Sequence, residues 1–209
     1  MAEATTTTKK TTKARKPSAS KATTSPKRKP ASLDLPQNPL MFEILDLASR
    51  QRSKAKKVEV LKRYECLTLK SLFIWNFDET VISELPEGDV PYGNQEDQLK
   101  YSGTLSESLA DKSRQMYTDG NFSLGSADSN GRTTLRAQTR NLYHFVRGGN
   151  AGLSGMRRES MFINLLESVH PLEAEIMVLV KDGLLENSYK VSFDVVKEAY
   201  PDIAWGGRG

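Results

Sequence analysis

Nine lysine and arginine side chains near the N-terminus form the most conspicuous chemical feature of this sequence. Residues 1–32 carry them against a single acid, Glu3, for a net charge of +8, whereas the other 177 residues carry 21 bases and 25 acids, a net charge of −4. The nine cations are Lys9, Lys10, Lys13, Arg15, Lys16, Lys21, Lys27, Arg28 and Lys29. Cations that neutralise phosphates release condensed counterions, which gives DNA or RNA affinity without sequence preference. We therefore predict contact with nucleic acid, while a solubilising tail or an acidic protein partner remain alternatives.

A glycine-rich stretch from Arg147 to Arg158 is a second candidate for anion binding. It leads into a predicted helix, and N–H groups at a helix N-terminus can bind phosphate. The candidate secondary anion site consists of Arg147, Gly149, Arg157, Arg158 and Lys181. However, the Gly-Lys-Ser/Thr ending of a Walker loop is absent, and a predicted helix rather than a strand precedes the stretch. A plain connection between two helices is therefore the favoured interpretation.

Residue types that usually carry catalysis or bind metals are few and isolated. The chain has two histidines and one cysteine, which leaves no zinc site of the usual type. His170 lacks an orienting carboxylate and a nucleophile, so we expect it to bond to the backbone of a turn. Cys66 lies in an apolar stretch and is expected to be a small buried residue. Glu84, Glu87 and Asp89 match no calcium loop and are expected to be solvated. We predict no catalytic residue, metal or cofactor, and we expect the protein not to be an enzyme.

The elements that must position these residues are mainly helices. Residues 1–32 contain no Leu, Ile, Val or aromatic residue and are predicted to be a disordered basic tail without base-stacking side chains. Residues 33–209 are predicted to form one compact helical domain. Within it, residues 93–131 are polar and rich in Gly, Ser, Asp and Asn, which indicates a long irregular middle region and a flexible insertion. One short helix with Leu105, Leu109 and Met116 is expected inside this insertion.

The first half of the predicted domain contains three helical stretches. Asn38-Pro39 provides a capping side chain and a proline at the first helical position, so it should open the first helix. The basic stretch 51–57 either continues this helix or breaks it near Ser53. A second helical run extends from Val58 to Cys66, and the apolar stretch 67–77 is predicted to be a buried helix. Val81-Ile82 is a candidate short strand.

The C-terminal third has the clearest helical patterns. Helices are predicted for residues 133–147, 155–169, from Pro171 to the stop at Gly183, and 193–200, while residues 189–191 are predicted to be extended. Leu165 and Leu179 lie inside continuous apolar patterns and are expected to be buried. Packing among these helices should be the main support of the fold.

The sequence contains no sign of a membrane or secretory segment. No apolar run reaches the ~18 residues that a membrane-spanning helix needs, and no apolar stretch follows the basic N-terminus within the first 30 residues. The single cysteine excludes an intramolecular disulfide and fits a reducing compartment. We therefore expect a soluble intracellular protein without membrane contact.

Several short motifs in the same order resemble a family of T4-like phage proteins, notably from cyanophages. The motifs are Leu85-Pro86-Glu87-Gly88 with Pro91-Tyr92, Gly148-Gly149-Asn150, the stretch from Met156 to Ile163, the stretch from Leu166 to Pro171, Lys181-Asp182, and the stretch from Lys197 to Pro201. The resemblance covers roughly residues 35–205 and excludes the basic tail. The family has no assigned activity, so no functional residues are carried over. The resemblance implies a phage-encoded protein in the cytoplasm of the bacterial host or in the virion.

Two functional hypotheses follow from these observations. The first is a non-enzymatic phage accessory protein whose basic tail contacts nucleic acid and whose folded body contacts a protein partner. The alternative is a virion structural or assembly component whose tail lies against packaged DNA.

Overall fold

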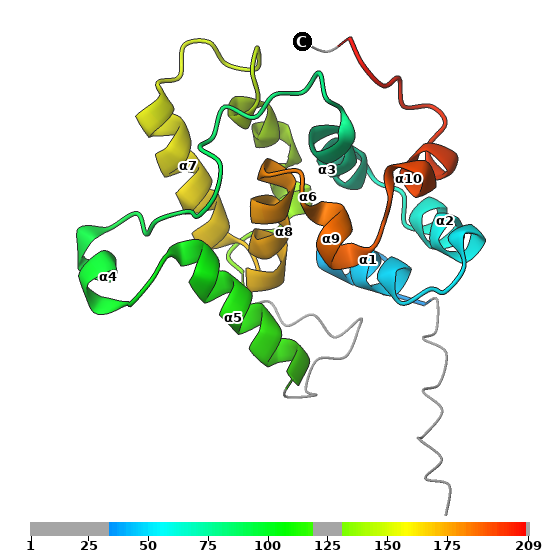
Figure 1. Cartoon of the computed structure of the whole chain (residues 1–209), viewed down its shortest axis with the longest axis horizontal. Helices are drawn as coiled ribbons and strands as arrows, with labels where there is room; N and C mark the ends of the chain where they lie inside the picture. Colours follow the sequence, from blue (N-terminus) through cyan, green and yellow to red (C-terminus); the bar gives the residue numbers. More distant parts are fainter. Residues whose placement is uncertain (1–33, 119–130, 208–209) are drawn as a thin grey trace, which may run out of the picture. The chain divides into compact units, whose positions relative to one another are not determined.

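The structure, a computed structural model, describes residues 34–118 and 131–207. These residues fall in one unit of the chain, Ala31–Gly209. They are mainly helical, which confirms the predicted fold class (Figure 1). The elements are α1 (Met41–Ser49), α2 (Lys54–Arg63), α3 (Leu67–Phe77), α4 (Gln95–Lys100), α5 (Leu105–Thr118), α6 (Leu135–Gln138), the 3-10 helix η1 (Thr139–Phe145), α7 (Gly155–Ser168), α8 (Pro171–Lys181), α9 (Leu185–Tyr189) and α10 (Phe193–Ala199). Among these helices, none is both long and apolar enough to span a bilayer.

Helix α8 is the element around which the others pack. It contacts α1, α3, α5, α7 and α9 (Figure 1). Its sequence is apolar on most sides, as expected for a helix surrounded by others, and its buried apolar residues are Leu172, Ala174, Ile176, Met177 and Val180. Beside this core, α2 packs against both α1 and α10. The central position of α8 explains why segments from both halves of the sequence share one core.

Local capping residues fix where several helices begin. Pro171 is the first residue of α8, and the Nδ1 atom of His170 accepts a hydrogen bond from the Leu172 N–H at 3.1 Å. This confirms the prediction that His170 bonds to the backbone of a turn. Ser53 accepts a hydrogen bond from the Lys56 N–H at 3.4 Å and caps α2, so the first helix breaks near Ser53 rather than continuing through residues 51–57.

Several predicted helices agree with the structure to within a few residues. The buried helix at 67–77 coincides with α3, and the helix at 155–169 ends one residue earlier, as α7. The first helix begins at Met41, two residues after the proline expected to open it. Cys66 lies in the N-cap position of α3 instead of inside α2, and it is half-buried rather than buried, with its Sγ 3.9 Å from the sulfur of Met41.

The predicted strand at Val81-Ile82 is wrong. The described residues contain only an isolated antiparallel bridge between Ser83 and Val146. It is flanked by hydrogen bonds from the Glu84 N–H to the Phe145 carbonyl at 2.9 Å and from the Arg147 N–H to the Ile82 carbonyl at 2.8 Å. The pairing does not extend because Pro86 soon follows on one side and the glycine-rich turn on the other.

The single helix predicted for residues 133–147 is divided into α6 and η1. Thr139, at the junction, bonds through its hydroxyl to the carbonyls of Leu135 and Arg136 at 3.2 and 3.0 Å. Side chains that bond to the preceding turn in this way often disturb a regular helix. In η1 the three-residue period places Leu142 and Phe145 on the same side, and both are buried.

Two further expectations in the C-terminal third need correction. Residues 189–191 are not uniformly extended, because Tyr189 ends α9 and Lys190 follows in the left-handed region with φ of 53°. Leu165 is buried as predicted, but Leu179 is only partly buried, because its side of α8 faces the hollow along α5. An apolar stretch alone cannot tell which of its members meets a neighbouring helix.

The stretch 93–131, predicted to be a flexible insertion, contains both α4 and α5. Helix α5 includes Leu105, Leu109 and Met116, which confirms the predicted short helix. It packs against α8 through a face on which Leu105 and Leu109 are buried. Residues 119–130 of this stretch lie outside the described residues.

Candidate functional site

The predicted nucleic-acid-binding tail lies outside the described residues. All nine of its cations, Lys9, Lys10, Lys13, Arg15, Lys16, Lys21, Lys27, Arg28 and Lys29, precede Asp34, the first residue that the structure describes. Contact between this tail and nucleic acid therefore stays a prediction.

Arg158, in the candidate secondary anion site, is turned into the protein. Its guanidinium side chain is 7% exposed, and its Nη1 lies 2.7 Å from a carboxylate oxygen of Glu84. Its Nε donates to the carbonyl of His144 at 2.8 Å, and its Nη2 donates to the carbonyls of Asn150 and Leu153, each at 3.3 Å. These bonds hold the glycine-rich turn from within and leave the guanidinium little capacity for an external anion.

Lys181 is likewise directed inward. Its side chain is 1% exposed and its Nζ contacts Asp182 at 2.5 Å. The same Nζ donates to the carbonyls of Pro86 and Gly88, each at 2.9 Å. Because the ammonium group has three donors, these three partners use all of them. Arg158 from α7 and Lys181 from α8 therefore both fasten the loop that starts at Glu84.

The other members of the candidate secondary anion site remain near the surface. Arg147 has a side chain that is 63% exposed, with its Nε 4.0 Å from Glu84, and Arg157 is exposed. Gly149 approaches the Tyr143 carbonyl so closely that a Cβ there would lie 1.8 Å from the oxygen. Of the five predicted residues, two thus face internal partners, Gly149 permits tight packing, and only Arg147 and Arg157 present charge to solvent. The geometry favours the plain helix connection.

Two of the three acids in the turn at residues 84–89 contact other groups of the protein. Glu84 pairs with Arg158, and Asp89 accepts a hydrogen bond from the Ser106 hydroxyl at 3.1 Å. Across the described residues, no three His, Cys, Asp or Glu side chains come together in an arrangement suited to a metal ion.

A buried carboxylate, Glu173, connects three helix N-termini. One oxygen accepts from the N–H of Met41, the first residue of α1, at 3.0 Å, and the other accepts from the N–H of Leu135, the first residue of α6, at 2.9 Å. Glu173 itself lies in the first turn of α8. Burial raises the pKa of this carboxyl group above the ordinary 4.5, against the two N–H bonds, which lower it. Its bonds to backbone groups assign it to the fold rather than to chemistry on a substrate.

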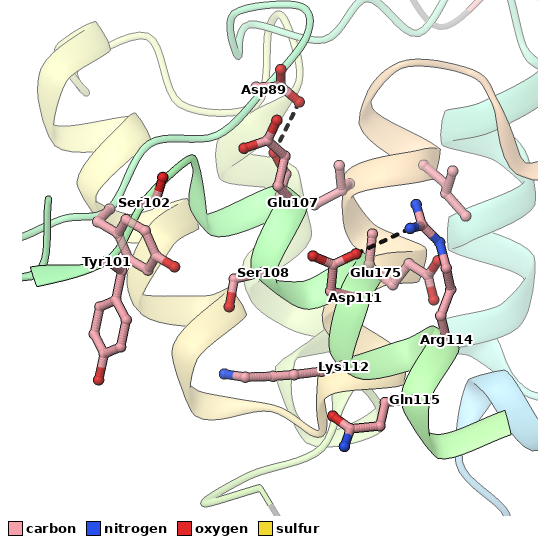
Figure 2. Close-up of a pocket in the computed structure, with 15 residues that line it drawn as sticks. Asp89, Tyr101, Ser102, Glu107, Ser108, Asp111, Lys112, Arg114, Gln115 and Glu175 are labelled. Atoms are coloured by element: carbon pink, nitrogen blue, oxygen red, sulfur yellow. Dashed lines mark hydrogen bonds and ion pairs between the residues drawn. The ribbon is translucent and has the colours of Figure 1, made fainter. Parts of the chain in front are cut away.

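A polar hollow of about 670 Å³ follows α5 and is shown in Figure 2. We call it the α5 hollow; it lies between α5, the segment around Tyr101 and the α8 residues Glu175, Val178 and Leu179. Asp111 and Arg114 form an exposed ion pair at 3.0 Å on its rim. Burial raises the pKa of Glu175, while a hydrogen bond from Ser113 and the charge of Arg114 act in the opposite direction. The α5 hollow thus offers charges of both signs and an exposed tyrosine, a lining typical of a polar binding surface.

A run of arginines without acids distinguishes one part of the folded body. Residues 131–158 contain six arginines and no Asp, Glu or Lys. The six are Arg132, Arg136, Arg140, Arg147, Arg157 and Arg158. Four of them are exposed, whereas Arg158 is buried and Arg136 is half-buried with a bond to the Pro39 carbonyl at 3.1 Å. The net charge of −4 outside the tail concealed this segment, and counting charge in a sliding window would have detected it.

The comparisons with known proteins give one match. No curated protein and no solved structure matches this chain. One sequence family matches residues 44–129 and 125–187, which together span more than half of the chain and most of the described helices. The chain therefore belongs to the family of unknown function DUF6433.

Proposed function

We propose that this protein is a non-enzymatic accessory protein of a phage, with a basic tail that contacts nucleic acid and a folded body that contacts a protein partner. The observation that carries the proposal is the segregation of charge, +8 in residues 1–32 against −4 in the rest of the chain. Polyanion affinity of this kind is electrostatic and independent of sequence. The resemblance of the sequence motifs to those of cyanophage proteins is what supports the phage origin.

A binding role is supported by what the buried ionisable groups do. Glu173, Arg158 and Lys181 are all bonded to backbone groups inside the fold. A catalytic group needs free donor or acceptor capacity toward a substrate. These three side chains use their hydrogen-bonding groups to position helices and loops. This is consistent with a folded body that presents surfaces to binding partners.

The α5 hollow is the surface that we assign to the protein partner. Its volume of about 670 Å³ and its mixed lining suit polar side chains of another protein. Tyr101 at its edge is 49% exposed, and exposed tyrosines are enriched in protein interfaces. Replacing Tyr101 and Arg114 together should abolish partner capture without changing the affinity for nucleic acid.

The test of the tail is a salt titration of duplex DNA binding by fluorescence anisotropy. The intact chain should show a slope of log K against log salt of roughly −4 to −7, since each neutralised phosphate contributes about −0.9. A variant with all nine tail cations changed to glutamine should lose most of the affinity. The matched control carries the same 32 residues in scrambled order and should bind as the wild type does. An intact chain that binds neither DNA nor RNA at low salt would overturn the proposal.

The alternative, a virion component whose tail lies against packaged DNA, rests on the same segregation of charge. It differs in where the protein accumulates. Mass spectrometry of purified particles separates the two: many copies per particle would favour the virion component, and absence from particles would favour the accessory protein in the host cytoplasm.

A further inference from the structure

A groove of about 300 Å³ lies between α3 and η1. Its apolar lining includes Ile74 and Trp75 from α3 and Leu142 and Tyr143 from η1, and the cation Arg147 lines it as well. We call it the α3–η1 groove. The short antiparallel pairing described above joins the end of η1 to residues 82–84, next to the lining residue Val81, and so fixes this wall of the groove by backbone hydrogen bonds.

The 3-10 geometry of η1 places a cation and an aromatic ring on one exposed side. Residues i and i+3 eclipse each other in such a helix, so Arg140 lies one turn before Tyr143 on the same side. Both residues are exposed, with Tyr143 at 49%. The Tyr143 ring lies 3.9 Å from the ring of His144, at an angle of 36°, and this contact orients it before any ligand binds. A pre-oriented aromatic ring loses little freedom on binding.

The electrostatics around the groove favour an anionic ligand. Arg140 and Arg147 belong to the segment 131–158, which contains no acid. Glu84, the acid that contacts Arg147, is already paired with Arg158 at the shorter distance of 2.7 Å, against 4.0 Å to Arg147. Arg147 therefore keeps most of its charge available to solvent.

Trp75 forms part of the apolar wall of the groove. Its side chain is 7% exposed, it stacks on Phe145 with ring centroids 6.1 Å apart, and no acceptor within the described ranges bonds to its Nε1–H. The Nε1 atom is itself buried, so this N–H lies inside the wall of the groove and is not offered to a ligand. The groove thus combines an exposed aromatic ring with flanking arginines.

We infer that the α3–η1 groove binds single-stranded nucleic acid, with an unpaired base stacked on Tyr143 and adjacent phosphates at Arg140 and Arg147. Aromatic rings combined with cations along a groove are the general means of binding unpaired strands. This inference rests on the proposed function, which it deepens by naming the class of nucleic acid. It also gives the body a role that the tail lacks, since the tail has no aromatic residue to stack on bases.

The experiment uses the full-length chain with Trp205→Phe, which leaves Trp75 as the only tryptophan of the two in the sequence. The probe is an oligodeoxythymidylate of about 12 nucleotides, within the usual range of single-strand site sizes. Its affinity is measured by anisotropy, and Trp75 emission reports whether the groove is occupied. A duplex of the same length measures binding by the tail alone.

The variants separate stacking, charge and folding. Tyr143→Ala should weaken oligonucleotide binding by roughly 5- to 150-fold, the range found when a stacking ring is removed, and should leave duplex affinity unchanged. Tyr143→Phe keeps the ring and should bind as the wild type does. Tyr117→Ala is the matched control, because Tyr117 is a similarly exposed tyrosine, at 40%, but lies outside the groove.

Two double variants test whether the position of the arginines matters, since each variant removes the same number of positive charges. Arg140→Gln with Arg147→Gln should reduce oligonucleotide affinity more than Arg132→Gln with Arg157→Gln, although both pairs come from the same acid-free segment and both are exposed. Equal losses in the two pairs would mean that only the overall charge matters, which would overturn the assignment to the groove.

The outcomes distinguish the groove from the tail. Quenching of Trp75 by the oligonucleotide, lost in Tyr143→Ala, supports the inference. Oligonucleotide binding with unchanged Trp75 emission and no effect of Tyr143→Ala overturns it and leaves the tail proposal standing. Absence of binding to both oligonucleotide and duplex overturns both. A Trp75 response to an acidic amphipathic peptide but not to the oligonucleotide would overturn it in favour of a protein ligand.

Discussion

Replacing Arg158 by alanine should destabilise the protein by about 3.5–5 kcal/mol. The 2.8 Å bond from its Nε to the His144 carbonyl is charge-assisted and contributes roughly 1.5–3 kcal/mol. The two 3.3 Å bonds to the Asn150 and Leu153 carbonyls are long and together contribute about 1 kcal/mol. The pair with Glu84, whose side chain is 31% exposed, contributes about 1 kcal/mol more.

The measurement is urea denaturation followed by far-ultraviolet circular dichroism, with the free energy of unfolding extrapolated to water. Arg157→Ala is the matched control, because Arg157 is the preceding residue on the same helix but is exposed, and it should change stability by no more than about 0.5 kcal/mol. If Arg158→Ala cost less than about 1 kcal/mol and instead removed binding of phosphate, the guanidinium would be an anion ligand, and the structural assignment would be refuted.

Three further expectations concern the core, pH and the tail. Leu165→Ala should cost ~2–5 kcal/mol in a urea titration, because Leu165 is buried, whereas Leu179→Ala should cost less, because Leu179 is only partly buried; equal costs would contradict the burial. The pKa of Glu173 is raised by burial above 4.5, so the stability that its protonated form provides is complete below pH 4.5 and is lost as the pH rises through the folded-state pKa. Relative to Glu173→Gln, the free energy of unfolding of the wild type should therefore decline as the pH rises above 4.5, and a difference that is constant from pH 4.5 to 8 would count against the raised pKa. Deleting residues 1–32 should move the melting temperature by only a few degrees in calorimetry, and an insoluble product would contradict this.

Helices whose ends carry strong local signals were predictable from the sequence. Pro171 and the glycine at 183 delimit α8, and the apolar stretch at 67–77 could hardly be accommodated except as the buried helix α3. The division of residues 133–147 into α6 and η1 was not predictable, because apolar residues at a spacing of three satisfy the pattern of either helix type. Lys190 in the left-handed region was also missed, since that conformation is ordinarily signalled by glycine or asparagine.

In the candidate site, residue type alone does not determine which side chains are exposed. Arg157 and Arg158 are identical neighbours in the sequence, yet one is exposed and the other is 6% exposed with four internal partners. Successive residues on a helix point about 100° apart, and only the position of α7 against the 84–88 loop decides which of the two turns inward. The acid-free segment, by contrast, is a property of the sequence and needed no structure to be found.

Two buried hydrogen bonds join residues that are far apart in the sequence and are therefore translated many seconds apart. The Tyr200 hydroxyl donates to the carbonyl of Leu61 at 2.7 Å across 139 residues, and Glu173 reaches Met41 across 132. At a translation rate of about 5–20 residues per second, Tyr200 is made roughly 7–28 s after Leu61. During this interval α1 and α2 can pack on each other, but α1 lacks α8 until residue 181 is made and α2 lacks α10 until residue 199 is made. Apolar surface of both helices therefore stays exposed on the nascent chain, and their packing is completed only after α10 has been translated.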